Sequence, residues 1–155
     1  MLWSFRLLVL FLSSGSLVNM GARGILNGNK SNCEIISRIA SKNSHIISRA
    51  YIEGNGKDTK GHTECNGLLL DDKSSVYTIP ELKANIIDTE LSHEASIGKI
   101  AGEKLNYLMS RGLNEETARA LLIRGFLEKG IHGLPANLEK KLDKLIEIAT
   151  SGEGV

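Results

Sequence analysis

The chain has 155 residues, of which 19 are basic and 18 acidic, and this length suits one ordinary domain with a small appendage. The net charge of +1 and the aromatic content of 5% provide neither a basic surplus nor a base-stacking surface, so nucleic acid is not an expected partner. Sixteen glycines and two prolines indicate many tight turns but fall short of a disordered or collagen-like composition.

Residues 1–22 form an atypical apolar N-terminus. One early charge, Arg6, precedes the apolar run of residues 7–12, and small residues follow. This order is similar to that of a secretory signal. The run is too short for a membrane-spanning helix, which needs about 20 apolar residues, so no membrane partner is expected. A buried strand, or an unusual start on a truncated chain, remains the alternative interpretation.

Short runs of strand-favouring residues fill the chain from residue 17 to residue 88. Turn signals such as Gly54-Asn55-Gly56 separate them. The sequence IISR at residues 35–38 returns at residues 46–49. Regular strands near that spacing are typical of a sandwich, a barrel or a β-solenoid, and in a solenoid the equivalent residues of successive coils stack into columns.

The spacing of apolar residues becomes helical from residue 98. A first short helix is predicted to end at Gly112 as the residue after its C-cap, and Asn114 is predicted to cap the start of a second helix that ends near Gly130. Pro135 suits the first turn of a third helix. We therefore expect a β-helix part over residues 23–97 and a helical C-terminal domain over residues 98–155.

Two places carry side chains suited to metal or proton chemistry. Cys65 follows His62 by three residues, and on an extended strand the two would point to opposite faces, as would the adjacent His93 and Glu94. A cysteine thiolate is a soft ligand for iron, copper or zinc, whereas a buried cysteine is also an ordinary small apolar residue. The segment from His93 lacks the second histidine of a zinc-protease helix, so a polar junction that caps the following segment is its other interpretation.

The remaining cysteine and histidines are weaker candidates for a metal or catalytic site. Cys33 has no histidine or cysteine at ligand spacing, and His45 in a turn and His132 in a helix connection are expected to be solvated or structural. The two cysteines do not make a disulfide framework, which predicts free thiols in a reducing compartment. The chain has no P-loop, no dinucleotide-binding glycine pattern and no Gly-x-Ser-x-Gly elbow, so we expect no ATP site of its own.

Three segments occur in order: “GHTECNGLLLDDKSSVYTIPEL”, then “LSHEASIGKI”, then “LNYLMSRGLNEETARALLIRGFLEKG”. Together they resemble the C-terminal part of the SufB/SufD proteins, which are scaffold components of the Suf iron–sulfur cluster assembly machine. The similarity covers roughly residues 23–130, and the pair of predicted helices is its clearest piece.

The resemblance implies a mainly β fold with an α tail, namely a truncated parallel β-helix followed by a small three-helix C-terminal domain. It also implies a cytoplasmic scaffold subunit that is not itself an enzyme and that carries a transient iron–sulfur cluster. Family members pair through their β-helices as homo- or heterodimers of SufB/SufD-like subunits. Their helical domains bind SufC, an ABC-type ATPase, and a cysteine desulfurase is the expected sulfur donor.

In SufB, cluster formation is tied to a cysteine in a T-x-C strand and to a downstream His-Glu pair. Thr63-Glu64-Cys65 matches the first motif, and His93 and Glu94 match the second, at a separation from Cys65 that is similar to the SufB arrangement. SufD-like proteins need not keep the cysteine or the glutamate, so this set is closer to SufB. Cys65, His93 and Glu94 are therefore predicted to bind iron or a cluster where stacked coils bring them to one shared edge.

Other interpretations stay open beside this one. Family members are normally much longer, and residues 1–22 do not resemble them, so the apolar start is interpreted as a cap, a signal or a mark of truncation. The chain is alternatively a SufD-like interaction partner without its own cluster ligands. It is otherwise a secreted β-solenoid with a cleaved leader, for which a partnership with the cytosolic ATPase would fail.

Overall fold

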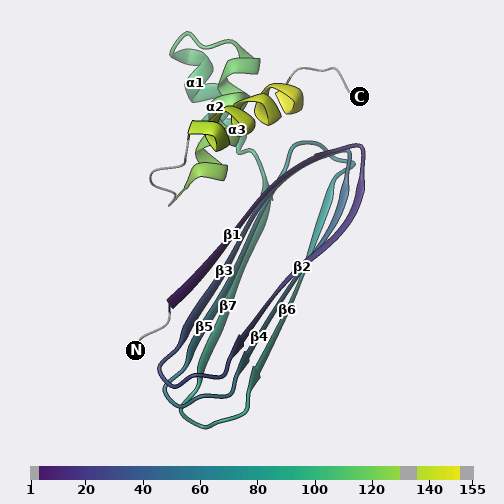
Figure 1. Cartoon of the computed structure of the whole chain (residues 1–155). Helices are drawn as coiled ribbons and strands as arrows, with labels where there is room; N and C mark the ends of the chain where they lie inside the picture. The colour runs from purple at the N-terminus through teal and green to yellow at the C-terminus, as the bar shows by residue number, and fades with distance from the viewer. Residues whose placement is uncertain (1–3, 130–135, 151–155) are drawn as a thin grey trace.

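The computed structural model describes residues 4–129 and 136–150 of the chain. These residues form strands that wind between two sheets, followed by helices (Figure 1). The strands are β1 (Ser4–Ser14), β2 (Leu17–Leu26), β3 (Asn32–Lys42), β4 (His45–Gly54), β5 (Lys60–Leu69), β6 (Ser75–Ala84) and β7 (Glu90–Lys99). The helices are α1 (Gly102–Ser110), α2 (Glu115–Glu128) and α3 (Ala136–Thr150).

The strands form a parallel β-solenoid in which each coil adds one strand to each of two facing sheets (Figure 1). Sheet A has the order β1-β3-β5-β7, and sheet B has the order β2-β4-β6. Neighbouring strands are parallel, and residues paired between strands, such as Asn32 and Lys60, lie one full coil apart in the sequence. The predicted parallel β-helix followed by three helices is confirmed for the part of the chain that the structure describes.

The repeated IISR sequence has a different meaning from the one that its spacing suggested. Residues 35–38 lie on β3 and residues 46–49 lie on β4, which are the two strands of one coil and belong to different sheets. The true columns join residues one coil apart, so that Ile35 lies between Leu7 and Thr63. The shift from residue 35 to residue 46 is therefore the step from strand to strand within a coil, not the period of the solenoid.

The apolar N-terminal segment is part of the solenoid in the residues that the structure describes. β1 pairs with β3 along its whole length, from Ser4 with Asn32 to Ser14 with Lys42. The expected boundary after residue 22 falls inside β2, and β7 extends past the expected boundary at residue 97 to Lys99. The structure thus places this apolar run in a strand of sheet A, which is the strand interpretation that the sequence left open beside a signal.

The interior of the solenoid is filled by alternate residues from both sheets, as the two-residue period of a strand requires. The isoleucines Ile35, Ile39, Ile46 and Ile52 are almost fully buried there. Gly61 allows a close approach between coils, because a Cβ atom at this position would lie 2.7 Å from side-chain atoms of Ile52 and Leu91. Packing of the interior therefore holds each strand in one register, since a slip of one residue would turn its apolar side chains to the outside.

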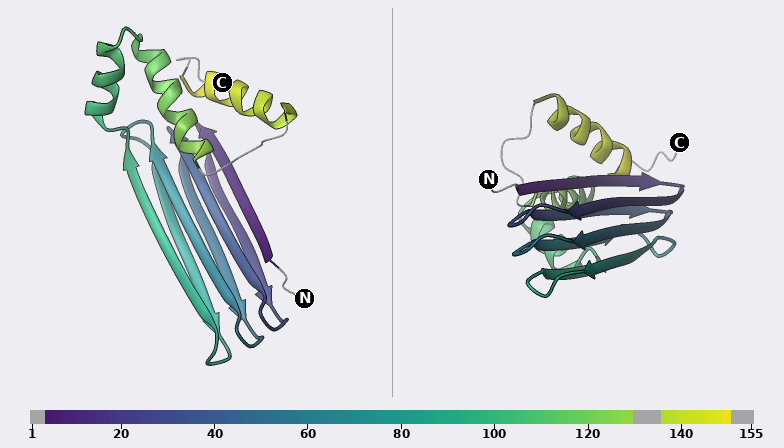
Figure 2. Two further views of the ribbon diagram at one scale, coloured as in Figure 1. Left: turned by 90° about the vertical axis from the view of Figure 1, so that its left-hand side faces the viewer. Right: turned by 60° about the horizontal axis from the view of Figure 1, so that its bottom comes forward.

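The helices cover the outer face of sheet A near the C-terminal ends of its strands (Figure 2). Leu12, Ala40 and Leu68 lie side by side in one outward-facing row of β1, β3 and β5. This row packs into one core with α2 and α3, whose contributing buried residues are Ile123, Leu127, Leu142 and Ile146. The helical part therefore shares a hydrophobic core with the solenoid, and burial of this core holds the two parts together.

The ends of the first two helices follow the predicted signals. Gly112 has a φ of 95°, a backbone conformation that favours glycine after a helix. The side chain of Asn114 caps α2 by accepting a hydrogen bond of 2.8 Å from the backbone N–H of Thr117. The predicted roles of Pro135 and His132 lie outside the described residues.

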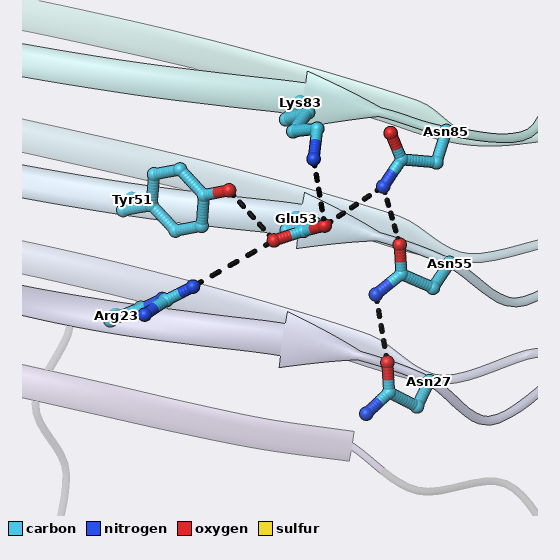
Figure 3. Close-up of polar contacts among 7 residues, drawn as sticks. All are labelled: Arg23, Asn27, Tyr51, Glu53, Asn55, Lys83 and Asn85. Carbon is cyan, nitrogen blue, oxygen red and sulfur yellow. Dashed lines mark hydrogen bonds and ion pairs between the residues drawn. The ribbon is translucent and has the colours of Figure 1, made fainter.

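A network of polar side chains ties the coils together on the outer face of sheet B (Figure 3). The Glu53 carboxylate accepts hydrogen bonds from the Tyr51 hydroxyl at 2.7 Å, the Asn85 amide at 2.8 Å and the Lys83 ammonium at 3.1 Å. These partners, with the Tyr51 hydrogen bond as the largest contribution, lower the pKa of Glu53 to about 2. A ladder of Asn27, Asn55 and Asn85 continues the network through the turns, with amide hydrogen bonds of 2.8 and 2.6 Å (Figure 3).

The network predicts an acid-dependent loss of stability. Because the folded-state pKa of Glu53 lies below its ordinary value of 4.5, the carboxylate stabilises the fold fully above about pH 4.5, and this contribution is lost as the pH falls towards 2. Urea unfolding of the wild type should therefore show a steeper decline in the free energy of unfolding from pH 5 to pH 2 than unfolding of Glu53→Gln. Glu81→Gln, which changes an exposed carboxylate on the same face, is the control and should follow the wild type.

Candidate functional site

Cys65 points into the solenoid from β5. Its side chain is only 7% exposed and packs with Ile39, Ile46 and Val76. Its partner across the last pair of sheet A strands is Ala95. The thiol therefore lies on the inner face of sheet A, on the strand next to the edge strand β7.

His93 lies on the edge strand β7 and shares the inward-facing set of positions with Cys65. It is paired with Thr63, two residues before Cys65 on the neighbouring strand. Strands about 4.8 Å apart with a rise of about 3.3 Å per residue place the Cα atoms of His93 and Cys65 about 8 Å apart. The His93 side chain is exposed because no further strand lies beyond β7 in the part of sheet A that the structure describes. The fold thus brings the thiol and the imidazole to one face at an open edge.

Glu94 lies on the opposite face of the same strand. It is paired with Glu64 on the outer face of sheet A, and Glu64 accepts a hydrogen bond of 3.1 Å from Arg38. The register therefore joins Cys65 with His93 but separates Glu94 from both. All three residues lie at or next to the same edge, yet they do not share one face.

His62 and Cys33 remain apart from this pair of residues. His62 faces outwards, where its Nδ1 forms a hydrogen bond of 2.9 Å with Ser92 Oγ, so the prediction that His62 and Cys65 point to opposite faces is confirmed. Cys33 is buried in the interior, and burial, followed by the neighbouring Glu34 carboxylate, raises the pKa of its thiol. Both cysteines are free thiols, as predicted.

His45 differs from its expected position. It is the first residue of β4 rather than part of a turn, and its Nδ1 forms a hydrogen bond of 2.8 Å with Ser75 Oγ on β6. Only Asn43 and Ser44 separate β3 from β4, so the strand already begins at His45. His45 therefore connects two coils on the outside of sheet B.

The donors available within one copy of the chain do not complete a metal site. Among residues 4–129 and 136–150, no three His, Cys, Asp or Glu side chains are grouped closely enough to hold a metal ion. Cys65 and His93 provide one sulfur and one nitrogen donor, which are ligand types that iron accepts. Within one chain the two donors are thus too few to complete a metal site: His93 is exposed at the edge, and Cys65 is buried one strand behind it.

The edge formed by β7 is suited to strand pairing. The backbone N–H of Glu90 donates to Thr59 at 2.9 Å, so by alternation the even-numbered N–H groups of β7 point towards β5 and the odd-numbered groups point away from the sheet. On β6, Ser75 donates to Ser44, and by the same alternation Pro80 stands at a position that faces away from sheet B. Pro80 has no N–H and so blunts that edge, whereas β7 contains no proline.

Three exposed apolar side chains on the last described coil were not anticipated from the sequence. Ile97 on β7 is 40% exposed, Tyr77 on β6 is 64% exposed, and Ile87 in the turn between these strands is 97% exposed. Their place on the last described coil follows only from the coil period, which identifies β7 as the last described strand of sheet A.

The fold defines a parallel β-solenoid protein with an unpaired edge strand, and the comparisons with known proteins give its family. Residues 6–126 match the family described as SUF system FeS cluster assembly, SufBD core domain. The chain belongs to this family, so the resemblance seen in its sequence is confirmed.

Several relatives are described as iron–sulfur cluster assembly SufBD family proteins. The protein of Archaeoglobus fulgidus is 47% identical over 91% of this chain and 38% of its own length. The protein of Methanothermobacter thermautotrophicus is 44% identical over 88% of this chain and 34% of its own length, and that of Pyrococcus horikoshii is 44% identical over 85% and 28%. The chain therefore spans about a third of the length of these relatives. No helix within the described ranges is long and apolar enough to cross a membrane.

The placement of the two cysteines predicts an order of reactivity. With iodoacetamide at pH 8, Cys65 should react faster than Cys33 in the folded chain, because Cys65 lies next to the open edge while Cys33 is 2% exposed and has a raised pKa. Peptide mass spectrometry over a time course measures both rates. In urea the two rates should converge, and faster reaction of Cys33 in the folded chain would contradict the placement.

Proposed function

We propose that this chain acts as a scaffold on which iron–sulfur clusters are assembled, in the cytoplasm, and that it is not itself an enzyme. The observation that carries the proposal is the position of Cys65 and His93 on one face at the unpaired edge of a SufBD core domain. The cluster is cargo here, built and then passed on. A site with few donors from each chain suits such a transient role, because it binds less tightly than a closed set of four ligands.

In this proposal, the thiolate of Cys65 binds iron or accepts sulfur, and the imidazole of His93 provides a second ligand from the edge strand. Cys65 is shielded by Ile39, Ile46 and Val76, so access comes from the open end of the solenoid. A cysteine desulfurase supplies the sulfur as a persulfide: the Cys65 thiolate would attack the outer sulfur of that persulfide, and the thiolate of the donor would leave. Glu94, on the outer face, is placed to contact iron from a second chain rather than to complete a site with its own Cys65.

The second chain in the proposal is a copy of this chain or a related SufB/SufD-like subunit. Backbone N–H groups of β7 that point away from the sheet are hydrogen-bond donors for a pairing strand, and Ile97 and Ile87 supply apolar contact beside them. Pairing of two such edges would bring two sets of donors together. This arrangement would provide the ligands that a single described chain lacks.

The proposed partner of the helical part is a SufC-type ABC ATPase. Tyr107 and Met109 on α1 and Leu121 on α2 are exposed, and an apolar groove of about 300 Å³ runs between these helices along Tyr107, Leu108 and Leu122. Exposed aromatic and apolar side chains next to a groove are typical of docking surfaces. Since the sequence has no P-loop, the energy of nucleotide hydrolysis would come from this partner.

Anaerobic reconstitution with iron and sulfide tests the cluster-binding role. Cys65→Ala and His93→Ala should each lower the bound iron and sulfide by about tenfold or more, because each removes a proposed ligand. Metal and sulfide analysis, with the visible absorbance of the cluster, measures the loss. Cys33→Ala is the matched control, since it removes the other thiol of the interior, and it should retain its cluster.

A second function is favoured by the separation of Glu94 from Cys65 and His93. In that case the chain is a SufD-like partner that pairs and docks the ATPase but holds no cluster ligands. The same experiment distinguishes the two proposals: wild-type protein that co-purifies with the ATPase yet binds no iron or sulfide under reconstitution supports the second. Unchanged cluster content in Cys65→Ala and His93→Ala would contradict the first.

The proposed pairing through β7 is open to a separate test. Ala95→Pro removes an N–H that points away from sheet A and leaves the hydrogen bonds between β5 and β7 in place. The wild type should form a dimer at micromolar concentration, and Ala95→Pro should be monomeric with an unchanged far-ultraviolet circular dichroism spectrum. Analytical ultracentrifugation measures both.

The control for this variant is Asn19→Pro, which changes an outward-facing position on β2 at the other end of the solenoid. It should leave the dimer intact. A monomeric wild type, or a dimer that survives Ala95→Pro, would contradict pairing of two copies through β7.

A further inference from the structure

A second hollow lies on the outside of the solenoid, away from the inner face that holds Cys65 and His93. It is a groove of about 610 Å³ between the outer face of sheet A and helices α1 and α2. Its floor is made by Arg38, Asn66 and Ser96, which lie side by side on β3, β5 and β7, and by Leu68. Leu121, Leu122 and Phe126 form part of the helical wall.

The charged side chains that line this groove are all cations. They come from three different parts of the fold: Arg38 from β3, Lys99 from the end of β7, and Lys104 and Lys129 from the helical part. Glu64 forms an ion pair with Arg38, and Asp72 forms one with Lys99. No carboxylate among the described residues forms an ion pair with Lys104 or Lys129, so the groove keeps an excess of positive charge.

Arg38 provides an independent sign that a partner is missing. The residue is only 5% exposed, and its Nη2 donates to Glu64 at 3.1 Å. Its Nε–H is buried and has no acceptor in the described part of the chain. Buried N–H groups of a guanidinium are nearly always hydrogen-bonded, because an unpaired one loses its hydration without compensation. An arginine buried to this degree at the floor of a cationic groove is typical of a built anion site.

We propose that this groove binds a small organic or inorganic polyanion through phosphate or carboxylate oxygens. The volume lies within the range of small-molecule sites, and Lys104 and Lys129, which have no carboxylate partner among the described residues, line it beside Arg38. Leu68, Leu122 and Phe126 add an apolar wall that suits the carbon skeleton of such a ligand. This site is distinct from the proposed cluster site, because Arg38 and Ser96 face outwards while Cys65 and His93 face inwards.

Titration of the whole chain with pyrophosphate and, separately, with citrate tests the proposal and distinguishes the two kinds of oxygen. Calorimetry should show saturable binding of at least one probe at one site per chain. Nitrogen-15 spectra of arginine side chains should show a shift of the Arg38 Nε–H signal over the same concentration range. Lys104→Gln/Lys129→Gln, which changes two exposed lysines, should weaken binding by about tenfold.

The matched control is Lys57→Gln/Lys140→Gln, which removes the same charge from exposed positions outside the groove and should bind as the wild type does. Circular dichroism checks that each variant is folded. Absence of saturable binding by both probes, or equal weakening by the two double variants, would overturn the proposal. Binding of a hexaglutamate peptide without binding of either small anion would also overturn it and would indicate an acidic protein segment instead.

Discussion

The in-register stacking of parallel coils is the constraint on which the rest of this structure depends. Once Asn32 pairs with Lys60 and Lys60 with Glu90, the position of every residue on sheet A relative to its neighbours is fixed. Because side chains alternate between the two faces of a strand, the pairing also decides which residues enter the interior and which face outwards. A buried column that includes Ile35 and Thr63 makes any other register costly, since a slip of one residue would expose it.

The same constraint explains the division of the candidate site. Adjacent residues on a regular strand point to opposite faces, so the side chains of His93 and Glu94 lie on different sides of β7. His93 joins Cys65 on the inside, and Glu94 joins Glu64 on the outside. Bringing Glu94 to the face that holds Cys65 and His93 would require a bulge in β7, and the continuous pairing from Glu90 to Lys99 contains none. A shared site between two edges is consistent with this geometry, whereas a complete site in one described chain is not.

Local signals in the sequence predicted local structure well. Asn114 and Gly112 marked the ends of helices because capping depends on only a few neighbouring residues. The opposite orientation of His62 and Cys65 followed from the two-residue period alone. The coil period was not predicted from the sequence, because residues that pair are a whole coil apart and no local motif marks that distance. The IISR repeat gave the spacing between the two strands of one coil instead. The groove at Arg38 was also hidden, since its residues come from separate coils and helices.

The coil period itself changes next to the candidate site. The step along the chain from Lys60 to its partner Glu90 is longer by two residues than the step from Asn32 to its partner Lys60. The extra length lies in the turn between β5 and β6, which spans residues 70–74, whereas only residues 43–44 separate β3 from β4. Asp71 in the longer turn accepts a hydrogen bond of 2.7 Å from the backbone N–H of Asn43, which fastens it to the coil before.

Two neighbours of Asp71 use this longer turn to connect the solenoid with its surroundings. Leu70 packs into the core beneath α2 and α3, and Asp72 forms an ion pair with Lys99 at the end of β7. Through these two contacts, the longer turn between β5 and β6 connects the end of β7 with the core under the helices. Because β7 carries His93 and Glu94, the helical part and the open edge are mechanically connected through one turn. A partner docked on the helices would consequently act close to the end of the strand that carries the proposed cluster ligands.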